Sequence, residues 1–495
     1  MAGVPAADRP ECQSKVGRAG GWCKRNGRPD MGVHGAGKDG NSRLSAAAKC
    51  VYASGDLTAN AALAAVSLVF APFFLIEVAG LRPALAGLVP LVGRLVDALT
   101  DPLMGRISDA TAWRWGRRRP YFLLGAVPFG ASFALLWTTP PLPGDLSRFA
   151  FYAAAYSALA VSMTVVSVPY LALIPEMALD YDERTSLNTY RGAAAIVGIL
   201  VALALRPLAE RLGGGAQGFA AAGLVMGACL AAPWAGVFAV SFERPEHRAR
   251  RASIPLMRGI AVAMANPTFR RLTMLYLCGR VAIDLVAAML LLYFTHWIGR
   301  SSDFEPLMAV FLLTVVAVLP AWLAIAKRLE KATVFTLGAT WWLCAQMVLL
   351  AGQPSWPRWL FFACFAATAV GYAVVDLMPW AMIGDVIDED DLVTAERREG
   401  LYNGVFLFLR KLSGAVAVFA ALGVLDLAGL ESGRPAPPGA LRAIRLLASV
   451  APALWLAAAI GFARGYPLTR ERHRALRERI EKRSGRGAQS SVTLQ

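Results

Sequence analysis

Twelve apolar segments, each about long enough to cross a bilayer, restrict the fold of this chain more than any other feature. They lie near residues 47–76, 84–108, 121–139, 150–175, 188–206, 218–241, 271–297, 305–326, 333–351, 357–384, 401–425 and 443–463. A hydrocarbon core about 30 Å thick needs roughly 20 apolar residues in a helix, and it offers no water to an open sheet edge. We therefore predict an all-α membrane protein with twelve transmembrane helices.

The composition agrees with a membrane protein rather than a soluble one. Of the 495 residues, 56% are apolar and 17% are charged, whereas roughly a quarter of a soluble domain is charged. The net charge of +16 would suit nucleic acid, but the basic residues lie between apolar segments and form no soluble basic face. We expect the lipid bilayer as a partner and no nucleic acid.

Cysteine and histidine provide no sign of a disulfide framework or a metal centre. The seven cysteines form no C-x-x-C pair, and the four histidines lie far apart. Residues 32–38 fit the phosphate-loop spacing G-x-x-x-x-G-K, but Asp39 stands where a Ser or Thr would hold magnesium. We take this match as chance. With no nucleophile motif either, we expect no enzyme activity and no cofactor.

The connections between the spans alternate in charge. The loops at 77–83, 140–149, 298–304 and 352–356 hold only three basic residues, Arg82, Arg148 and Arg300. By contrast, basic residues crowd the connections after span two (Arg114, Arg117, Arg118, Arg119), span six (Arg244, Arg248, Arg250, Arg251, Arg258) and span eight (Lys327, Arg328, Lys331). Positively charged loops stay in the cytoplasm. We expect a multi-pass protein of the plasma (inner) membrane with both termini cytoplasmic.

The longest basic connection divides the spans into six and six. This division indicates two bundles from duplicated halves, with a solute cavity between them. The expected parts are a disordered cytoplasmic tail over 1–45, an N-terminal six-helix bundle over 46–242, a cytoplasmic central loop over 243–269, a C-terminal six-helix bundle over 270–464 and a basic cytoplasmic tail over 465–495. We expect this last tail to lie against anionic lipid, and the protein to be a monomer.

Asp97 and Asp101 stand four residues apart inside the second span, so they share one face of a helix, with Arg94 one turn before them. Counting back from the arginine cluster at about 1.5 Å per residue places Asp97 near the middle of the bilayer. Because an intramembrane carboxylate costs several kcal/mol, the pair indicates a water-filled cavity, a bound cation, a proton or a cationic partner. A static ion pair with Arg94 is the structural alternative.

Other ionisable residues also fall inside predicted spans. Asp56 lies early in span one, Arg191 early in span five and Lys411 a third to halfway along span eleven. Arg410 points about 100° away from Lys411, so we expect only one of the two to face a given cavity.

Span seven holds an acid and a base at helical spacing. Arg280 and Asp284 are four residues apart, and we expect them to neutralise each other. Asp376 in span ten has no evident local partner and is a weaker candidate for a functional role.

Three stretches of the sequence indicate a family. They are Asp97-Ala-Leu-Thr-Asp101-Pro-Leu-Met-Gly105 running on to Arg114–Pro120; Pro169–Met177 with Asp180–Thr185; and Asp385-Val-Ile-Asp388 with Arg397–Gly400 and Lys411. In this order they resemble the glycoside–pentoside–hexuronide:cation symporters, of the melibiose-permease type. The resemblance covers nearly all of 47–464 and implies the major facilitator fold, two bundles of six helices.

The resemblance implies roles for single residues. In the melibiose-permease branch two aspartates of span two and a threonine of span four hold the coupling cation, matching Asp97, Asp101 and Thr164. The residues that grip the sugar match Asp56 and Arg191. Carboxylate and hydroxyl oxygens suit a hard cation, so the implied metal ligands are Asp97 and Asp101, with sodium or a proton as the coupling ion.

The chain departs from that branch near the sugar. Ser167 stands where the branch has a further sugar-binding aspartate, and Leu171 replaces an aromatic residue. A serine can hydrogen-bond a solute but adds no charge, so we expect the solute to be held differently from melibiose. The span-eleven lysine of the branch matches Lys411, which we expect to couple the two sites by exchanging contact with the aspartates.

Charged residues at the cytoplasmic ends of the spans predict a gate. The candidates are Arg117, Arg118, Glu176, Arg184, Asp385 and Asp388, which we expect in loops, where opposite charges would clasp the two halves in the outward-facing state. The alternative is a solvated charged rim, because exposed pairs contribute under about 1 kcal/mol.

The function expected from these features is secondary active transport, a cation-coupled (sodium or proton) symport of a sugar or glycoside by alternating access. One alternative is a non-sugar solute such as a lysolipid on the same scaffold, which a lateral opening lined by Leu, Phe and Met would favour. A transport-inactive membrane receptor is the other alternative.

Overall fold

The computed structural model describes residues 44–178, 180–243, 256–394, 398–469, 471–472 and 475–476. Within these ranges the regular structure is helical, apart from one isolated bridge between Trp113 and Gly116. The expected tails over 1–45 and 465–495 lie largely outside the described residues, as does the phosphate-loop spacing at 32–38. The all-α expectation is confirmed.

The first half of the chain supplies six spans. They are α1 (Ala46–Ala65) continued by the π-helical η1 (Val66–Val78), α2 (Pro83–Ala110), α3 (Pro120–Leu136), α4 (Asp145–Met177), α5 (Tyr181–Leu203) with α6 (Leu205–Arg211), and α7 (Gly215–Ala231) with α8 (Pro233–Val240). Asp180, in the stretch after span four that carries the family resemblance, caps α5, because its carboxylate accepts the backbone N–H groups of Asp182 and Glu183.

The second half supplies six more spans in the same order. They are α10 (Pro267–Leu292) with η2 (Tyr293–Ile298), α11 (Phe304–Arg328) after the short η3 (Ser301–Asp303), α12 (Lys331–Val348) with η4 (Leu349–Ala351), α13 (Arg358–Thr394), α14 (Glu399–Leu427) and α15 (Pro438–Arg464). Each matches one of the predicted spans in sequence.

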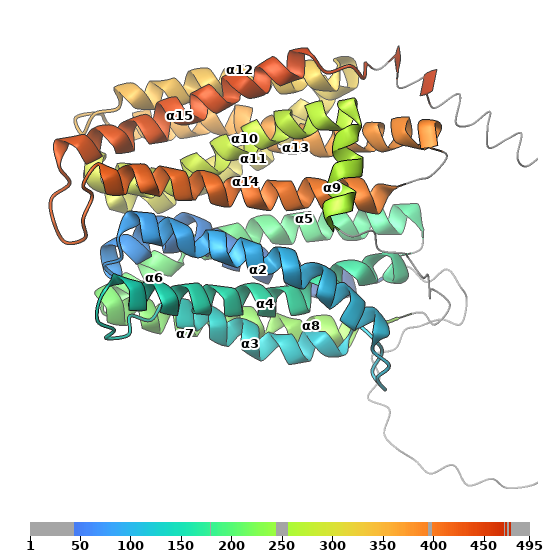
Figure 1. Ribbon diagram of the computed structural model, residues 1–495, viewed down its shortest axis with the longest axis horizontal. Coiled ribbons are helices and arrows are strands. Elements are labelled where there is room, and N and C mark those ends of the chain that lie inside the picture. The colour runs from blue at the N-terminus through green and yellow to red at the C-terminus, as the bar shows by residue number, and fades with distance from the viewer. Residues whose placement is uncertain are drawn as a thin grey trace, which may run out of the picture. The chain divides into compact units, whose positions relative to one another are not determined.

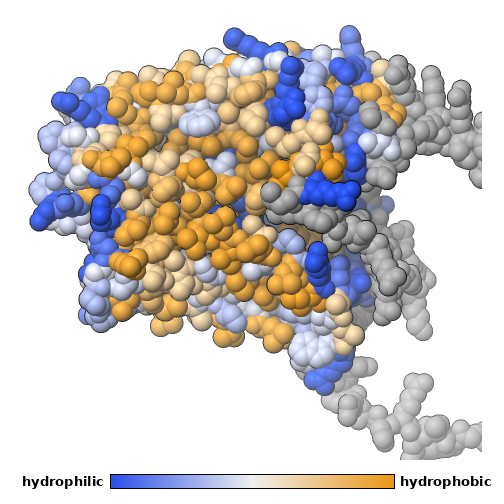
Figure 2. Space-filling model, viewed as in Figure 1, coloured by the Kyte–Doolittle hydropathy of each residue, from blue (hydrophilic) through white to orange (hydrophobic). Residues whose placement is uncertain are grey.

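Length and hydropathy fit a membrane protein. Among the described residues, eleven helices are long and apolar enough to cross a membrane, and a further apolar helix, Pro120–Leu136, is shorter. Figure 2 shows apolar residues covering the middle of the visible face, while hydrophilic residues gather at its two ends. This banding is what a hydrocarbon core imposes on a helical bundle.

Two expected boundaries are wrong. The tenth span was expected to end at 384, but α13 continues to Thr394, because the acidic stretch that follows remains helical beyond the apolar segment. The loop expected over 243–269 contains a helix, α9 (Leu256–Ala265). Asn266 then caps α10 by accepting the N–H groups of Thr268 and Phe269.

The six spans of each half lie together, one half below the other in the view of Figure 1. Because the number of spans is even, α1 starts and α15 ends at the same end of the bundle, which we call the terminal end. The opposite end, called the distal end, carries the connections 79–82, 137–144, 212–214, 299–303, 352–357 and 428–437.

Polar contacts join the two halves at the distal end. The buried Arg206 of α6 lies 2.7 Å from Glu305 of α11 and donates to the carbonyl oxygen of Ser301 at 2.6 Å. Two further ion pairs cross there, Arg82 to Asp426 at 2.8 Å and His296 to Glu77 at 2.9 Å.

The apolar core, like these polar contacts, joins the two halves towards the distal end. One cluster of buried side chains combines the first half with the distal part of the second, including Phe294, Phe304 and Leu425. The terminal part of the second half has a cluster of its own around Phe269 and Tyr402. The halves therefore share their core towards the distal end.

We predict that Glu305→Gln loosens the distal contact. The change leaves the buried Arg206 without its nearest carboxylate, and breaking one side of a buried pair costs about 3–5 kcal/mol. Spin labels at Leu212→Cys and Ser355→Cys, in a background whose seven native cysteines are replaced by serine, should gain a longer-distance population in nanodiscs. The matched control is Arg434→Gln, which removes only an exposed pair within the second half. An unchanged distance distribution in Glu305→Gln would contradict the prediction.

Candidate functional site

The two aspartates of span two lie on one face of α2, as their spacing predicted. Asp97 is 7% exposed, and the Asp101 side chain is 34% exposed. Thr164 of α4 donates its hydroxyl to Asp101 Oδ1 at 2.7 Å. The prolyl residue that follows, Pro102, cannot donate to the carbonyl oxygen of Ala98. Carboxylate, hydroxyl and carbonyl oxygens thus gather at one place on α2 and α4.

Two cations face these aspartates from opposite directions. Lys411 of α14 places its ammonium 2.9 Å from Asp101 Oδ2 and 3.8 Å from Asp97 Oδ2. Arg94, one turn earlier on α2, donates to Asp97 Oδ2 at 3.1 Å. The ion pair with Arg94 that the sequence suggested is therefore present, and Lys411 adds a link between the halves.

Among the residues that the structure describes, no three of His, Cys, Asp or Glu are placed to hold a metal ion. A cation at this site would have two carboxylates and the hydroxyl of Thr164 as its protein ligands. Such a small, hard-oxygen set suits a weakly held alkali cation or a proton better than a transition metal.

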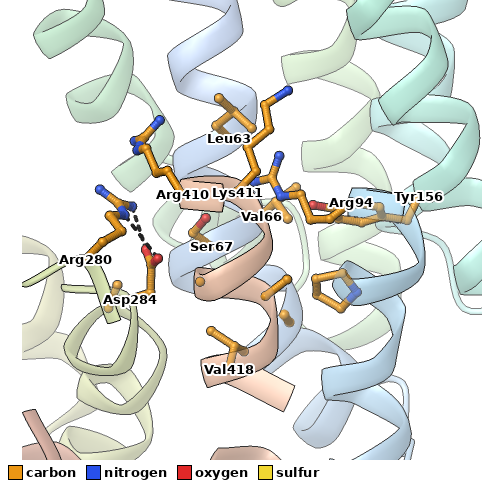
Figure 3. Close-up of a pocket in the computed structure, with 15 residues that line it drawn as sticks. Leu63, Val66, Ser67, Arg94, Tyr156, Arg280, Asp284, Arg410, Lys411 and Val418 are labelled. Atoms are coloured by element: carbon orange, nitrogen blue, oxygen red, sulfur yellow. Dashed lines mark hydrogen bonds and ion pairs between the residues drawn. The ribbon is translucent and has the colours of Figure 1, made fainter. Parts of the chain in front are cut away.

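A cavity of about 150 Å³ lies between the halves beside Lys411. We call it the central cavity. Its basic lining residues come from three helices: Arg94 from α2, Arg280 from α10, and Arg410 with Lys411 from α14 (Figure 3). The remaining walls include Leu63 and Ser67 of the first span and its π-helical continuation. Charge is thus concentrated at the interface that separates the two bundles.

A second cavity of about 280 Å³ adjoins the first, and its walls are mainly apolar although Gln346 and Asp376 also line it. We call it the apolar lobe. The two cavities share the lining residues Leu63, Ser67, Arg280, Asp284, Ala287 and Arg410. Beyond them the lobe extends to Leu290 of α10, Met308 and Phe311 of α11, and Phe365 of α13. The combined space has a charged part and a hydrocarbon part.

Two interior aspartates, Asp284 and Asp376, pair with the same arginine, Arg280. Arg280 and Asp284 neutralise each other as expected, through hydrogen bonds of 3.0 and 2.5 Å. Asp376, which has no evident local partner in the sequence, has one on another helix, because α13 packs against α10 and places its carboxylate 3.5 Å from Arg280. That separation gives an ion pair without a hydrogen bond to Asp376 Oδ1.

The expectation that only one of Arg410 and Lys411 faces a given cavity is wrong. Both line the central cavity, and Arg410 also lines the apolar lobe. A separation of 100° around α14 does not exclude this, because two long, flexible side chains at adjacent positions can both reach one cavity. In Figure 3 the dashed lines join Arg280 to Asp284, and none reaches Arg410.

The residues that the resemblance assigns to sugar binding are engaged with each other. Arg191 of α5 holds Asp56 of α1 through two hydrogen bonds of 2.6 and 3.1 Å, and the Tyr170 hydroxyl donates to the same carboxylate at 2.6 Å. Neither Asp56 nor Arg191 lines the central cavity or the apolar lobe. A solute that used this pair would have to replace these contacts.

Ser167 lies one helical turn beyond Thr164 on α4. Its hydroxyl oxygen is buried and makes no hydrogen bond to any described residue. Although Ser167 lies on the same helix as Thr164, no hydrogen bond links it to Asp97 or Asp101. Its assignment to the solute therefore remains a prediction from the resemblance.

In the first half the gate residues form an ion cluster at the terminal end. Arg117 and Arg118 contact Glu176 at 2.5 and 2.6 Å, and Arg118 also contacts Asp109 at 2.7 Å. Arg184 donates to the carbonyl oxygen of Ala178. Glu176 and Arg184 lie on α4 and α5 and not in loops, because both helices extend beyond their apolar segments.

Sequence reasoning missed the centre of this cluster, Glu243. Its carboxylate accepts the backbone N–H groups of Arg117, Arg118 and Arg119 at 2.8–3.1 Å. A Cβ at Gly116, whose φ is +105°, would meet this carboxylate at 2.5 Å, which explains the glycine before the arginines. Desolvation lowers the pKa of the Arg119 guanidinium, and Glu243 opposes the shift. The only available signal was an acid at the end of span six.

The second half repeats this arrangement with fewer charges. Lys331 at the start of α12 contacts Asp385 of α13 at 2.7 Å, as Arg117 contacts Glu176 in the first half. Asp388 lies nearly one turn further along α13. Both aspartates were expected in a loop but lie in the helix. Each of these pairs joins elements of a single half, so a clasp between the halves stays a prediction for another state.

The sequence is similar to known symporters over most of its length. An uncharacterised symporter of Synechocystis sp. is 29% identical, over 88% of this chain and 96% of the relative. A sodium-dependent lysophosphatidylcholine symporter, 1-A, of Danio rerio is 24% identical, over 81% of this chain and 82% of the relative.

The fold agrees with solved transporters. The crystal structure of the nucleoside transporter NupG superposes with a TM-score of 0.62 at 10% identity, covering 85% of this chain and 98% of that one. This likeness shows the major facilitator fold. The family described as "MFS/sugar transport protein" matches residues 51–470, which include all twelve spans except the first five residues of α1. The chain therefore belongs to this family and is a multi-pass, cation-coupled secondary transporter, not an enzyme.

Proposed function

We propose that the solute of this symporter is amphiphilic, with a hydrocarbon chain that occupies the apolar lobe and a polar group that lies in the central cavity. The observation that carries this proposal is that the two cavities adjoin and share six lining residues. A sugar alone would leave the lobe, with Leu290, Met308 and Phe311, to water or to no ligand, which loses the favourable burial of apolar surface.

The seam between α5 and α11 supports a hydrocarbon chain. Ile199 of α5 and Met308 of α11 both line the apolar lobe. An open groove of about 430 Å³ lies on the same seam at the distal end, lined by Leu203 and Ala309 together with the ion pair of Arg206 and Glu305. Apolar walls of Leu, Phe and Met along a seam between spans are the feature that favours a lysolipid-like solute. The relative named for lysophosphatidylcholine is consistent with it.

We propose Asp97, Asp101 and Thr164 as the site of the coupling cation. Lys411 places an ammonium against both carboxylates, so a cation that enters must displace it. Its displacement breaks a link between the halves, which ties cation binding to their movement. Sodium is the first ion to test, because oxygen ligands suit it and the Danio rerio relative is named sodium-dependent; a proton is the alternative.

We further propose that the terminal end faces the cytoplasm, in the plasma membrane, and that the structure is the inward-facing state. The basic cluster of Arg114, Arg117, Arg118 and Arg119 at this end supports the orientation. The ion pairs that cross between the halves at the distal end support the state.

A sugar or glycoside is the second candidate for the solute. The description of the matching family supports it, as do Asp56 and Arg191, whose carboxylate and guanidinium could exchange their mutual hydrogen bonds for those of sugar hydroxyls. An alkyl glycoside would satisfy both candidates, since its chain would fit the lobe. A transport-inactive receptor would bind such a solute without moving it.

Uptake of radiolabelled lysophosphatidylcholine into proteoliposomes should separate these candidates. With an inward sodium gradient, we expect a protein-dependent fraction that external serum albumin no longer extracts, several-fold above liposomes without a gradient. Labelled melibiose and octyl glucoside should be run beside it. Uptake of melibiose alone would overturn the amphiphile in favour of a sugar, and binding of a solute with no gradient-driven flux would indicate a receptor.

Asp97→Asn should abolish cation-stimulated uptake without loss of expression. The change removes one of the two carboxylates and leaves Arg94 with an amide in place of its partner, so a cation is held by about half the charge. Uptake should fall to the level seen without a gradient. Asp145→Asn, at the distal start of α4, is the matched control and should keep wild-type uptake. Full stimulation in Asp97→Asn would disprove the proposed cation site.

A further inference from the structure

Arg410 differs from the other basic residues of the central cavity. Arg94 lies 3.1 Å from Asp97, Arg280 lies 2.5 Å from Asp284, and Lys411 lies 2.9 Å from Asp101. The Arg410 side chain makes no ion pair or hydrogen bond with any described residue, and its Nε is buried without a partner. Among the described residues, Arg410 is thus the basic lining residue of this cavity that has no carboxylate within ion-pair distance, although Asp284 and Asp376 line the apolar lobe beside it.

The position of Arg410 relative to the two cavities also indicates a role. Arg410 lines both the charged cavity and the apolar lobe, so its guanidinium lies where the two spaces meet. A solute whose chain lies against Met308 and Phe311 would present its polar end at this junction. The neighbouring Arg280 is already held by Asp284 and Asp376, which leaves Arg410 to interact with the solute.

We propose that Arg410 binds an anionic group of the solute, such as a carboxylate or a phosphate. This inference rests on the proposed amphiphilic solute and adds the charge of its polar end. Arg410 is half-buried, and its buried Nε donor has no partner among the described residues, which is costly until a ligand supplies an acceptor. Its planar fork of donors matches the two oxygens of a carboxylate or phosphate, and hydrogen bonds between charged groups are about twice as strong as neutral ones.

A binding experiment with three octyl probes tests the proposal. Octyl glucoside and octyl glucuronide share chain and ring and differ by one carboxylate, and octyl phosphate replaces the sugar by a phosphate. Binding of each labelled probe to the full chain in nanodiscs is measured by equilibrium dialysis, with empty nanodiscs as the blank. We compare the wild type with Arg410→Gln, Arg410→Lys and the exposed-site control Arg434→Gln.

We expect the wild type to bind at least one anionic probe about tenfold more tightly than octyl glucoside. Arg410→Gln should reduce that ratio to about one while octyl glucoside binds as before, and Arg410→Lys should retain part of it. Arg434→Gln should keep the wild-type ratio. A preference for octyl phosphate alone would identify phosphate as the group, and a preference for octyl glucuronide alone would identify a carboxylate.

Two results would overturn the proposal in different ways. Equal binding of charged and neutral probes by the wild type, or a ratio that Arg410→Gln does not change, would remove the anionic group while leaving the amphiphilic solute intact. Failure of all three probes to bind the wild type would remove the amphiphilic solute and the anionic group together. A purely structural Arg410 would change folding or all affinities equally, and not the ratio.

Discussion

The contact of Lys411 with Asp97 and Asp101 links the two halves in the middle of the bundle, and the proposed coupling of cation and solute depends on it. Two carboxylates inside a membrane are stable only with compensating charge. The protein supplies that charge from Arg94 on the same helix, 3.1 Å from Asp97, and from Lys411 of the opposite half, at 2.9 and 3.8 Å. A lysine ammonium at this position acts as a tethered cation, so a free cation competes with a contact that also holds α2 to α14.

The same principle of local neutralisation organises both ends. At the distal end opposite charges cross between the halves, as in Arg206 and Glu305. At the terminal end the pairs Arg117 with Glu176 and Lys331 with Asp385 remain within one half. One set of charges thus joins the halves while the other stiffens each half. Alternating access requires such a difference, because one end must separate while the other stays closed.

Much of this arrangement could be predicted from periodicity. Apolar length located the twelve spans, and a separation of four residues placed Asp97 with Asp101 and Arg280 with Asp284, since these depend only on helix geometry. What periodicity could not supply is the packing between distant helices. It could not show that Asp376 reaches Arg280, that Glu243 caps the arginine loop, or that both Arg410 and Lys411 reach the central cavity. The helical continuation of α13 was missed because polarity was taken as the end of a helix.

Arg191 and Arg410 differ in their hydrogen-bond partners, and this difference bears on which chemical group of a solute each could bind. Arg191 has its full complement of partners in Asp56 and Asn188, with Tyr170 below its guanidinium. Arg410 has none among the described residues and lies at the border of the apolar lobe. A neutral sugar at Arg191 would exchange good hydrogen bonds for similar ones, whereas an anion at Arg410 would meet a charge that is still uncompensated. The larger gain in free energy lies at Arg410, because only there does the solute supply an interaction that the protein lacks.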